Sequence, residues 1–283
     1  MSPRMVDKYL AQPGAKDDVV KTIQTATDET LYFFTNKGNC FMLDVSKIPE
    51  TMKLRDRGSL LTGLIAGLAD HEHAVAMVCI KTEEMAKKGD FLFITKNGQV
   101  KRTTAAEYGI RRARFAAINL KGEDELVGMV QVDPDDKDDI ILITRLGTAL
   151  RFRLDTVSCT GRATAGVRGM DVGKDDEVRW FEIPKAGDML LVLSDRGFGK
   201  RMLSDDVERQ GRAGKGQKLL PMNKTGETGT QLAACLNVTG AKSARVEQRH
   251  GHVTVLNMDE IAVERRTSKG QLLINVLLDD VVE

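Results

Sequence analysis

The chain has 283 residues, enough for one large domain or two ordinary ones. Its 42 Lys and Arg residues nearly balance its 41 Asp and Glu residues, and the net charge of +1 excludes a uniformly basic protein. No apolar run reaches the length of a transmembrane helix and no signal peptide opens the chain, so we expect a cytoplasmic protein. The four cysteines lie far apart without a CxxC pair, which indicates reduced, buried thiols.

A β-hairpin pattern recurs along the chain. Each copy is a short apolar run, a polar turn with glycine and a second strand, at residues 31–45, 91–103, 140–154 and 189–203. A weaker fifth copy has its expected strands at 233–238 and 253–256. The turn glycines, Gly38, Gly98, Gly147, Gly197 and Gly251, recur every 49 to 60 residues, a period typical of propellers and related arrays.

The rest of the unit repeats as well. After each hairpin come a short acidic and apolar segment, a basic turn, and an apolar strand expected at 60–65, 115–120, 166–172, 217–220 and 271–277. An acidic turn then leads to a strand that opens the next unit, expected at 74–80, 125–132 and 178–183. Four strands per unit are typical of a propeller blade. Only residues 83–88 fit a helix, of one or two turns.

The sequence therefore predicts an all-β, propeller-like array of five to six four-stranded blades in a single domain, 1–283. The expected units are approximately 1–18 (partial), 19–70, 71–124, 125–176, 177–228 and 229–283. The first 18 residues match only the back half of a unit, and residues 278–283 match the opening of another. We therefore expect five units and a fragment whose hairpin is missing.

Basic residues recur at a fixed phase of the unit. The turn after each hairpin carries Arg55 and Arg57; Arg111, Arg112 and Arg114; Arg162 and Arg168; Arg209, Gln210, Arg212 and Lys215; and Arg265, Arg266 and Lys269. A second basic position follows the hairpin turn of the middle three units, at Lys101 and Arg102, Arg151 and Arg153, and Lys200 and Arg201. In an array of blades the same phase reaches the same rim, so these cations would form a stripe.

Such a stripe suits DNA that is bound through its phosphates. Arg209, Arg212 and Lys215 are the strongest expected phosphate contacts, because their turn also contains three glycines within eight residues. No recognition helix is visible, so binding should show little sequence preference and should bend the duplex.

Other interpretations start from the same residues. Exposed turns of many proteins are rich in Arg, Lys and Gly, so a propeller-like scaffold for protein interactions stays open.

A P-loop is rejected, because Arg209 stands where the motif needs glycine and Gly216 where it needs Ser or Thr. The pairs His71 with His73 and His250 with His252 lack further metal ligands and are expected in surface turns. Trp180 is expected in the core, and no catalytic set of nucleophile and base is visible.

The unit, with its TNKG or TKNG hairpin and its GRATAGVRGM segment, resembles the C-terminal domain of the bacterial DNA gyrase A subunit. The topoisomerase IV A subunit is a close second. The resemblance covers essentially the whole chain and implies a β-pinwheel of six blades that exchange strands. It also implies that double-stranded DNA wraps around the basic perimeter of the domain, which thereby contributes to DNA supercoiling. It implies a domain without a cofactor or catalytic residue of its own; ATP, Mg²⁺ and the catalytic tyrosine belong to other parts of the enzyme.

The same resemblance implies the partners, namely the breakage-reunion region of the A subunit and the ATPase B subunit. It also implies that the protein acts at the nucleoid and does not bind a membrane. The signature of the family is a box of Gln, a basic residue, Arg, Gly, Gly, a basic residue and Gly. Residues 210–216 match it except at Gly211 and Ala213. In gyrase the box lies in the first blade, yet residues 8–14, which align there, do not form one. Wrapping as in gyrase and bending as in topoisomerase IV, where the domain serves decatenation or relaxation, therefore both remain open.

Overall fold

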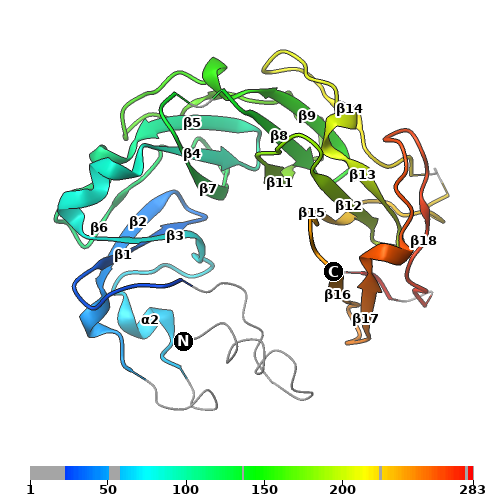
Figure 1. Cartoon of the computed structure of the whole chain (residues 1–283). Coiled ribbons are helices and arrows are strands. Elements are labelled where there is room, and N and C mark those ends of the chain that lie inside the picture. The colour runs from blue at the N-terminus through cyan, green and yellow to red at the C-terminus, as the bar shows by residue number, and fades with distance from the viewer. Residues whose placement is uncertain (1–22, 51–57, 136, 223–224, 278–279, 283) are drawn as a thin grey trace.

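The computed structural model describes residues 23–50, 58–135, 137–222, 225–277 and 280–282. These residues form four four-stranded antiparallel sheets and one two-stranded sheet, and Figure 1 shows the sheets side by side around an arc. We name the sheets A to E in chain order. Their strand orders are β3-β1-β2-β6, β7-β4-β5-β10, β11-β8-β9-β14, β15-β12-β13-β18 and β16-β17. The prediction of an all-β, blade-like array is confirmed.

The strand bounds follow the hairpin pattern closely. The hairpins are β1 (Thr30–Thr35) with β2 (Asn39–Asp44), β4 (Asp90–Thr95) with β5 (Gln99–Thr104), β8 (Asp139–Thr144) with β9 (Thr148–Arg153), β12 (Met189–Ser194) with β13 (Phe198–Leu203), and β16 (Ser243–Glu247) with β17 (Val253–Asn257). The inner strands are β3 (Ala74–Ile80), β7 (Leu126–Val132), β11 (Val178–Glu182) and β15 (Leu232–Asn237). The outer strands are short: β6 (Arg114–Ala116), β10 (Val167–Arg168), β14 (Gln217–Lys218) and β18 (Gln271–Leu272).

Each acidic and apolar segment after a hairpin forms a turn of 3₁₀ helix. These helices are η1 (Val45–Lys47), η3 (Ala105–Tyr108), η4 (Leu154–Thr156), η5 (Ser204–Asp206) and η6 (Met258–Glu260). The expected helical turn at 83–88 is η2 (Thr82–Lys88). The strand expected at 60–65 is wrong, because Leu61–Leu64 form the single helical turn α2. That segment packs against the face of sheet A that points away from sheet B, and it pairs with no described strand.

Every complete sheet takes strands from two successive units of the repeat. A hairpin contributes the middle two strands, and the next unit supplies the inner strand and the outer strand; β2, for example, pairs with β6, which follows the hairpin β4–β5. The expected unit boundaries therefore divide each sheet, and the strand exchange that the resemblance implied is present. In Figure 1, β7, β11 and β15 lie nearest the centre of the arc, and β6, β14 and β18 lie along its outer edge.

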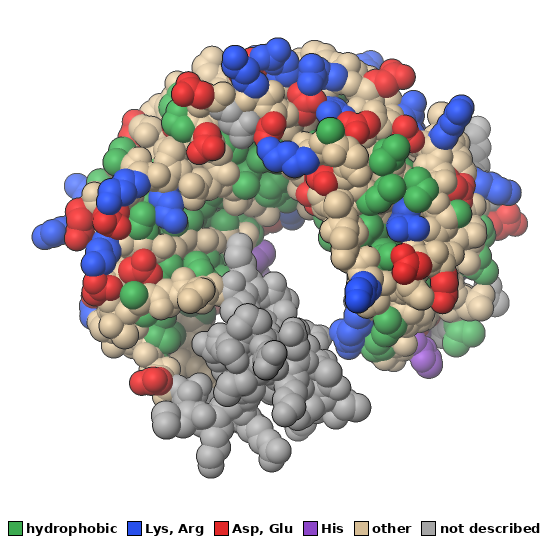
Figure 2. All heavy atoms as spheres, in the orientation of Figure 1, with side chains coloured by type: hydrophobic (Ala, Val, Ile, Leu, Met, Phe, Trp, Pro, Cys, Tyr) green, Lys and Arg blue, Asp and Glu red, His purple; other side chains and the backbone are tan. Residues whose placement is uncertain are grey.

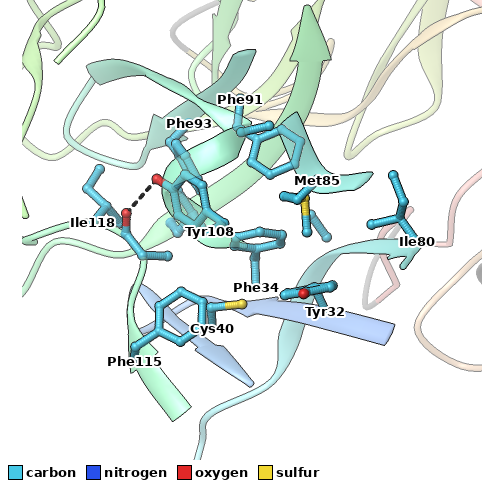
Figure 3. Close-up of a cluster of buried hydrophobic side chains, with 14 residues drawn as sticks. Tyr32, Phe34, Cys40, Ile80, Met85, Phe91, Phe93, Tyr108, Phe115 and Ile118 are labelled. Carbon is cyan, nitrogen blue, oxygen red and sulfur yellow. Dashed lines mark hydrogen bonds between the residues drawn. The ribbon is translucent and has the colours of Figure 1, made fainter. Parts of the chain in front are cut away.

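The core is a series of layers between neighbouring sheets. Along β4, Phe91 and Phe93 face sheet A, whereas Leu92 and Ile94 face sheet C, because successive side chains of a strand point to opposite faces. Both faces are buried, which explains why the middle strands are apolar without alternation. The layer between sheets A and B is aromatic, and Figure 3 shows Phe34 at its centre, with its ring 5.6 Å from that of Phe91 in an edge-to-face contact.

The fifth hairpin differs from the prediction. The segment expected as its first strand is β15, which pairs with β12 and completes sheet D. The true first strand is β16, whose alternating polar and apolar residues lie between the two expected strands. Val282 forms a bridge with Gln248 at the end of β16, so the last described residues do open another unit, as expected. Trp180 on β11 packs against the core between sheets C and D, as predicted.

Candidate nucleic-acid interface

Four turns on the outer edge carry most of the predicted site residues. We call them the basic turns: 110–114, 159–166, 209–216 and 263–270. Each runs into an outer strand, β6, β10, β14 or β18, so the turns recur at the same place on sheets A to D. Arg55 and Arg57 lie outside the described residues.

The last three basic turns are equivalent residue by residue. Parallel bridges join Arg102 to Cys159, Arg151 to Arg209 and Arg201 to Val263. Counting from these bridges, Arg162, Arg212 and Arg266 occupy one position of the turn, and Gly166, Gly216 and Gly270 another. The repeat therefore fixes a common geometry for each turn.

The shared glycine is required by a close approach of two backbones. Gly166, Gly216 and Gly270 have φ values of 83°, 78° and 72°. A Cβ on any of them would lie 2.5 Å from a carbonyl oxygen of the middle strand beneath, that of Val100, Ala149 or Gly199. Only glycine fits both conditions.

The shared arginine crosses to the preceding sheet. The Nη1 atoms of Arg162, Arg212 and Arg266 donate to the carbonyl oxygens of Ala116, Arg168 and Lys218 at 2.6, 2.5 and 2.9 Å. These three acceptors are equivalent residues of β6, β10 and β14. We call Arg162, Arg212 and Arg266 the junction arginines. All three are half-buried, which counts against the prediction that Arg212 is one of the strongest phosphate contacts.

Lys101 and Lys200 lie beneath the basic turns and away from the rim, contrary to the prediction. Their side chains are 1% and 0% exposed. The Nζ atom of Lys101 donates to the carbonyl oxygens of Ala117 and Arg162 at 2.9 and 2.6 Å. The Nζ atom of Lys200 donates to those of Arg265, Arg266 and Ser268 at 3.0, 2.7 and 2.5 Å.

A buried ammonium needs such acceptors, since leaving it without hydrogen bonds would be costly. Burial lowers the pKa of both lysines to about 8. The sequence held a signal for this placement, because the equivalent residue of the third hairpin is Leu150 and that of the first is Phe41. An apolar residue at the same phase indicates a position between the sheets.

The arginines predicted at the same phase of the hairpins also have partners within the chain. Arg102 is buried and its Nε lies 2.6 Å from Asp90 Oδ2, so its predicted place on the rim is wrong. Arg151 makes the equivalent 2.7 Å contact with Asp139. Arg201 has no acid in that place, because Met189 replaces it, and its Nε donates to a carbonyl oxygen of the turn after η6. Arg153 is partly exposed and pairs with Asp155.

The remaining predicted cations face solvent. Arg111, Arg112, Arg114, Arg168, Lys215, Arg265 and Lys269 are exposed. Lys218 is exposed as well and was not predicted, although it is equivalent to Arg168 on the next outer strand. We call these eight residues the outer cations. Figure 2 shows Lys and Arg side chains gathered along the outer edge of the arc beyond β5 and β9, with Asp and Glu interspersed over the rest of that face.

The outer cations differ in how freely their side chains can move. Arg114 donates to the carbonyl oxygen of Gly67 and lies over the ring of Phe41. Lys218 donates to the carbonyl oxygen of Leu146. Arg209 is not one of the outer cations, and it too is held: about half of its side chain is exposed, but it pairs with Asp139 at 3.0 Å. The expectation that Arg209 is a leading phosphate contact therefore weakens.

Comparison with protein families identifies the repeat. A sequence model described as the DNA gyrase C-terminal domain, a beta-propeller, matches residues 29–53, 89–133, 138–185 and 188–228, which is more than half of the chain. This chain belongs to the DNA gyrase C-terminal domain family. The strand exchange and the position of the basic turns are thus features of a gyrase C-terminal domain family member.

Relatives of two kinds align with this family member. The DNA gyrase A subunit of Deinococcus deserti is 34% identical over 264 residues, covering 91% of this chain and 31% of the relative. The gyrase A subunit of Helicobacter pylori J99 is 35% identical over 265 residues, covering 92% and 31%. The DNA topoisomerase 4 A subunit of Bacillus subtilis is 32% identical over 222 residues, covering 77% and 27%. The chain spans about a third of the length of these curated relatives.

Solved structures agree on the architecture. The C-terminal domain of a DNA topoisomerase IV superposes with a TM-score of 0.83 at 25% identity, covering 97% of this chain and 84% of that one. A DNA gyrase A C-terminal domain superposes with a TM-score of 0.68 at 18% identity, covering 91% and 82%, which supports the fold alone.

The box of this family member sits in the third basic turn. Gln210 is half-buried and its backbone N–H donates to the carbonyl oxygen of Arg151 at 2.8 Å. Ala213, where the family has glycine, takes a φ of 67°, a conformation that other residues rarely adopt. Its N–H donates to the carbonyl oxygen of Gly169 at 2.7 Å. One sheet earlier, the carbonyl oxygen equivalent to that of Gly169 belongs to Ala117, and it accepts from Lys101. In the third basic turn Leu150 occupies the position of that lysine, and the backbone N–H of Ala213 is the donor instead.

Other chemically reactive side chains are placed as follows. Tyr32 and Tyr108 are fully buried and donate to Thr82 Oγ1 and to the carbonyl oxygen of Ala117. Cys40 and Cys235 are buried, as predicted, but Cys159 is exposed in a basic turn. The described residues contain no group of three or more His, Cys, Asp or Glu placed to hold a metal ion. Nor does any described helix combine the length and apolarity that crossing a membrane requires.

Proposed function

We propose that this chain is a DNA-binding and DNA-bending domain of the A subunit of a type IIA topoisomerase, most closely of gyrase. The observation that carries this proposal is the recurrence of the outer cations at one place on sheets A to D. Phosphates bind such residues through charge and counterion release, without reading the bases. Because the sheets follow an arc, a duplex in contact with all four must bend.

The outer cations of successive sheets supply the contacts in order. Arg111, Arg112 and Arg114 stand on sheet A and Arg168 on sheet B; Lys215 and Lys218 stand on sheet C, and Arg265 and Lys269 on sheet D. Their side chains are long and flexible, so they can adapt to the backbone of any sequence. We therefore propose binding with little sequence preference.

The domain is proposed to be non-catalytic. Tyr32 and Tyr108, the two tyrosines that are described, are buried between sheets A and B and cannot reach a phosphodiester. The cleavage tyrosine, ATP and Mg²⁺ would belong to the rest of the A subunit and to the ATPase B subunit, which are its proposed partners. The domain itself would need no cofactor and would act at the bacterial nucleoid in the cytoplasm.

A topoisomerase IV role is the second candidate. Two observations favour it: the TM-score of 0.83 with a topoisomerase IV C-terminal domain, and the two departures from the box, at Gly211 and Ala213. In that case the domain would bend DNA without wrapping it in a definite hand. A gyrase-like domain would instead change the linking number of the DNA that it holds.

A topological assay tests the proposal. The chain is incubated with relaxed closed-circular plasmid and a nicking-closing topoisomerase, the protein is removed, and the linking difference is measured. A dose-dependent difference is expected for gyrase-like wrapping. Salt-sensitive binding without a linking difference would favour the topoisomerase IV role. Absence of binding at low salt would contradict both and leave a protein-interaction scaffold.

A further inference from the structure

The junction arginines join neighbouring sheets at three successive places. Arg162 reaches from a turn seated on sheet B to β6 of sheet A, and its guanidinium also lies 5.1 Å from the ring centre of Phe115. Arg212 reaches from a turn seated on sheet C to β10 of sheet B. Arg266 reaches from a turn seated on sheet D to β14 of sheet C. One interaction is thus repeated at the junctions A/B, B/C and C/D.

At junctions B/C and C/D the bond joins segments that carry outer cations. The acceptor of Arg212 is the carbonyl oxygen of Arg168, whose own side chain faces solvent, and three residues after Arg212 stands the exposed Lys215. The acceptor of Arg266 is the carbonyl oxygen of Lys218, and Lys269 follows three residues later. The bond therefore ties together the segments that carry the cations of adjacent sheets.

The guanidinium groups of the junction arginines are partly withdrawn from solvent. The Nε atoms of Arg212 and Arg266 are buried and find no hydrogen-bond partner among the described residues. Such partly desolvated groups are held by the carbonyl that they contact, because a charged donor makes a strong hydrogen bond there. Lys215, by contrast, is exposed and has no hydrogen-bond or ion-pair partner in the described part of the chain.

One backbone bond recurs at the inner strands: the N–H groups of Leu126, Val178 and Leu232 donate to the carbonyl oxygens of Asn36, Lys96 and Arg145. At the outer edge, the contacts other than the arginine differ from junction to junction. At A/B and B/C, the N–H groups of Asn119 and Asp171 donate to the carbonyl oxygens of Thr164 and Gly214. At C/D the equivalent residue is Pro221, which has no N–H, and the equivalent carbonyl, that of Ser268, accepts from Lys200. Among these outer-edge bonds, the junction arginine is common to all three junctions.

We propose that Arg162, Arg212 and Arg266 are positioning residues that set the path of bound DNA by fixing the angle between sheets, while the outer cations supply affinity. This inference rests on the proposed DNA function. A duplex is stiff, so its bend is dictated by where successive phosphate contacts stand. Loosening a junction changes those places without removing a contact.

Two matched variants separate the roles. Arg212→Met and Lys215→Met each remove one positive charge from the same turn, three residues apart. Affinity and its salt dependence are measured by fluorescence anisotropy on a short duplex. Bending is measured by energy transfer between dyes at the two duplex ends, and thermal unfolding checks that each variant is folded. The pair Arg266→Met and Lys269→Met repeats the comparison at junction C/D, in case one arginine variant fails to fold.

The arginine variants should reduce the bend and leave the salt slope of binding unchanged. The lysine variants should make the slope shallower by about one per lost contact and leave the bend of the bound duplex unchanged. Replacing all three junction arginines should reduce the bend further than any single replacement. An arginine variant that lowers the salt slope like its lysine partner, or that bends DNA like the wild type, overturns the inference.

Wild-type behaviour distinguishes this inference from the proposed function. A wild-type chain that does not bind DNA defeats the proposed function itself. A wild-type chain that binds DNA without bending it keeps DNA binding but contradicts the proposed bending. A wild type that bends DNA, together with arginine variants that bend it equally, overturns the positioning role alone.

Discussion

The backbone N–H of Ala213 points at the carbonyl oxygen of Gly169, 2.7 Å away on the neighbouring sheet. To make this bond Ala213 adopts a φ of 67°, whereas Ala163, its equivalent in the preceding turn, is not left-handed. At junction A/B the Lys101 ammonium donates to the equivalent carbonyl oxygen, that of Ala117. The backbone bond of Ala213 therefore replaces this lysine bond at junction B/C. A glycine at this position, as in the family box, would adopt the same φ without the steric cost that alanine carries.

Ala213→Gly should therefore stabilise the fold. A left-handed alanine costs about 1–2 kcal/mol, and the entropy of glycine in the unfolded chain offsets about 0.5–1 kcal/mol of the relief. We expect the free energy of unfolding to rise by roughly 0.5–1 kcal/mol in denaturant titrations. Ala163→Gly is the matched control, and it should lower the free energy of unfolding instead. Equal effects of the same sign would contradict the role assigned to this conformation.

Gly216→Ala should be strongly destabilising. The new Cβ would meet the carbonyl oxygen of Ala149 at 2.5 Å and would force a left-handed alanine. We expect a loss of roughly 2–4 kcal/mol, combining strain and displacement of the strand. Gly211→Ala in the same turn has open space around its Cβ and should change stability little. Calorimetry of the two variants checks the contrast, and a benign Gly216→Ala would count against the close approach.

The buried lysines predict an unusual pH dependence. The folded pKa of Lys101 is about 8, below its ordinary value of 10.5, so between these values the unfolded chain binds more protons than the folded chain. The free energy of unfolding should therefore rise as the pH increases from about 8 to about 10.5. Lys200, with a pKa also lowered to about 8, should contribute in the same direction.

Subtraction isolates this contribution. The difference in unfolding free energy between wild type and Lys101→Met is measured across that pH range by urea titration. The same difference for Lys215→Met, which removes an exposed lysine, serves as the reference. A difference for Lys101→Met that does not change across the pH range would show that its ammonium stays charged when folded.

The outer and buried cations should differ in DNA binding. Lys218→Ala is expected to lower affinity for all duplex sequences alike and to make the plot of log K against log salt shallower by about 0.9. Lys200→Met removes the same charge from a buried site and should leave that slope unchanged. The comparison is made by anisotropy with two unrelated duplexes. A slope that changes with Lys200→Met would place its ammonium in contact with phosphate.

The sequence by itself determined the repeat, the all-β class and the phase of the basic turns. This was possible because a middle strand buried on both faces must be apolar throughout, and because Gly166, Gly216 and Gly270 are each forced by a close backbone approach. The first four hairpins were located to within a residue or two. The family resemblance rested on the same regularities, and it was the resemblance that implied the strand exchange.

Only the tertiary structure decided which cations face solvent. Lys101 and Lys215 are the same residue type and each lies within a basic stretch. Lys101 is nevertheless buried beside the aromatic layer between sheets A and B, whereas Lys215 is exposed at the outer edge of the arc. Burial depends on the sheet that stacks alongside, and that partner comes from another unit of the chain. For the same reason β15 could join sheet D and Arg212 could turn toward Arg168, since the strand or carbonyl that each contacts lies some forty residues or more away in sequence.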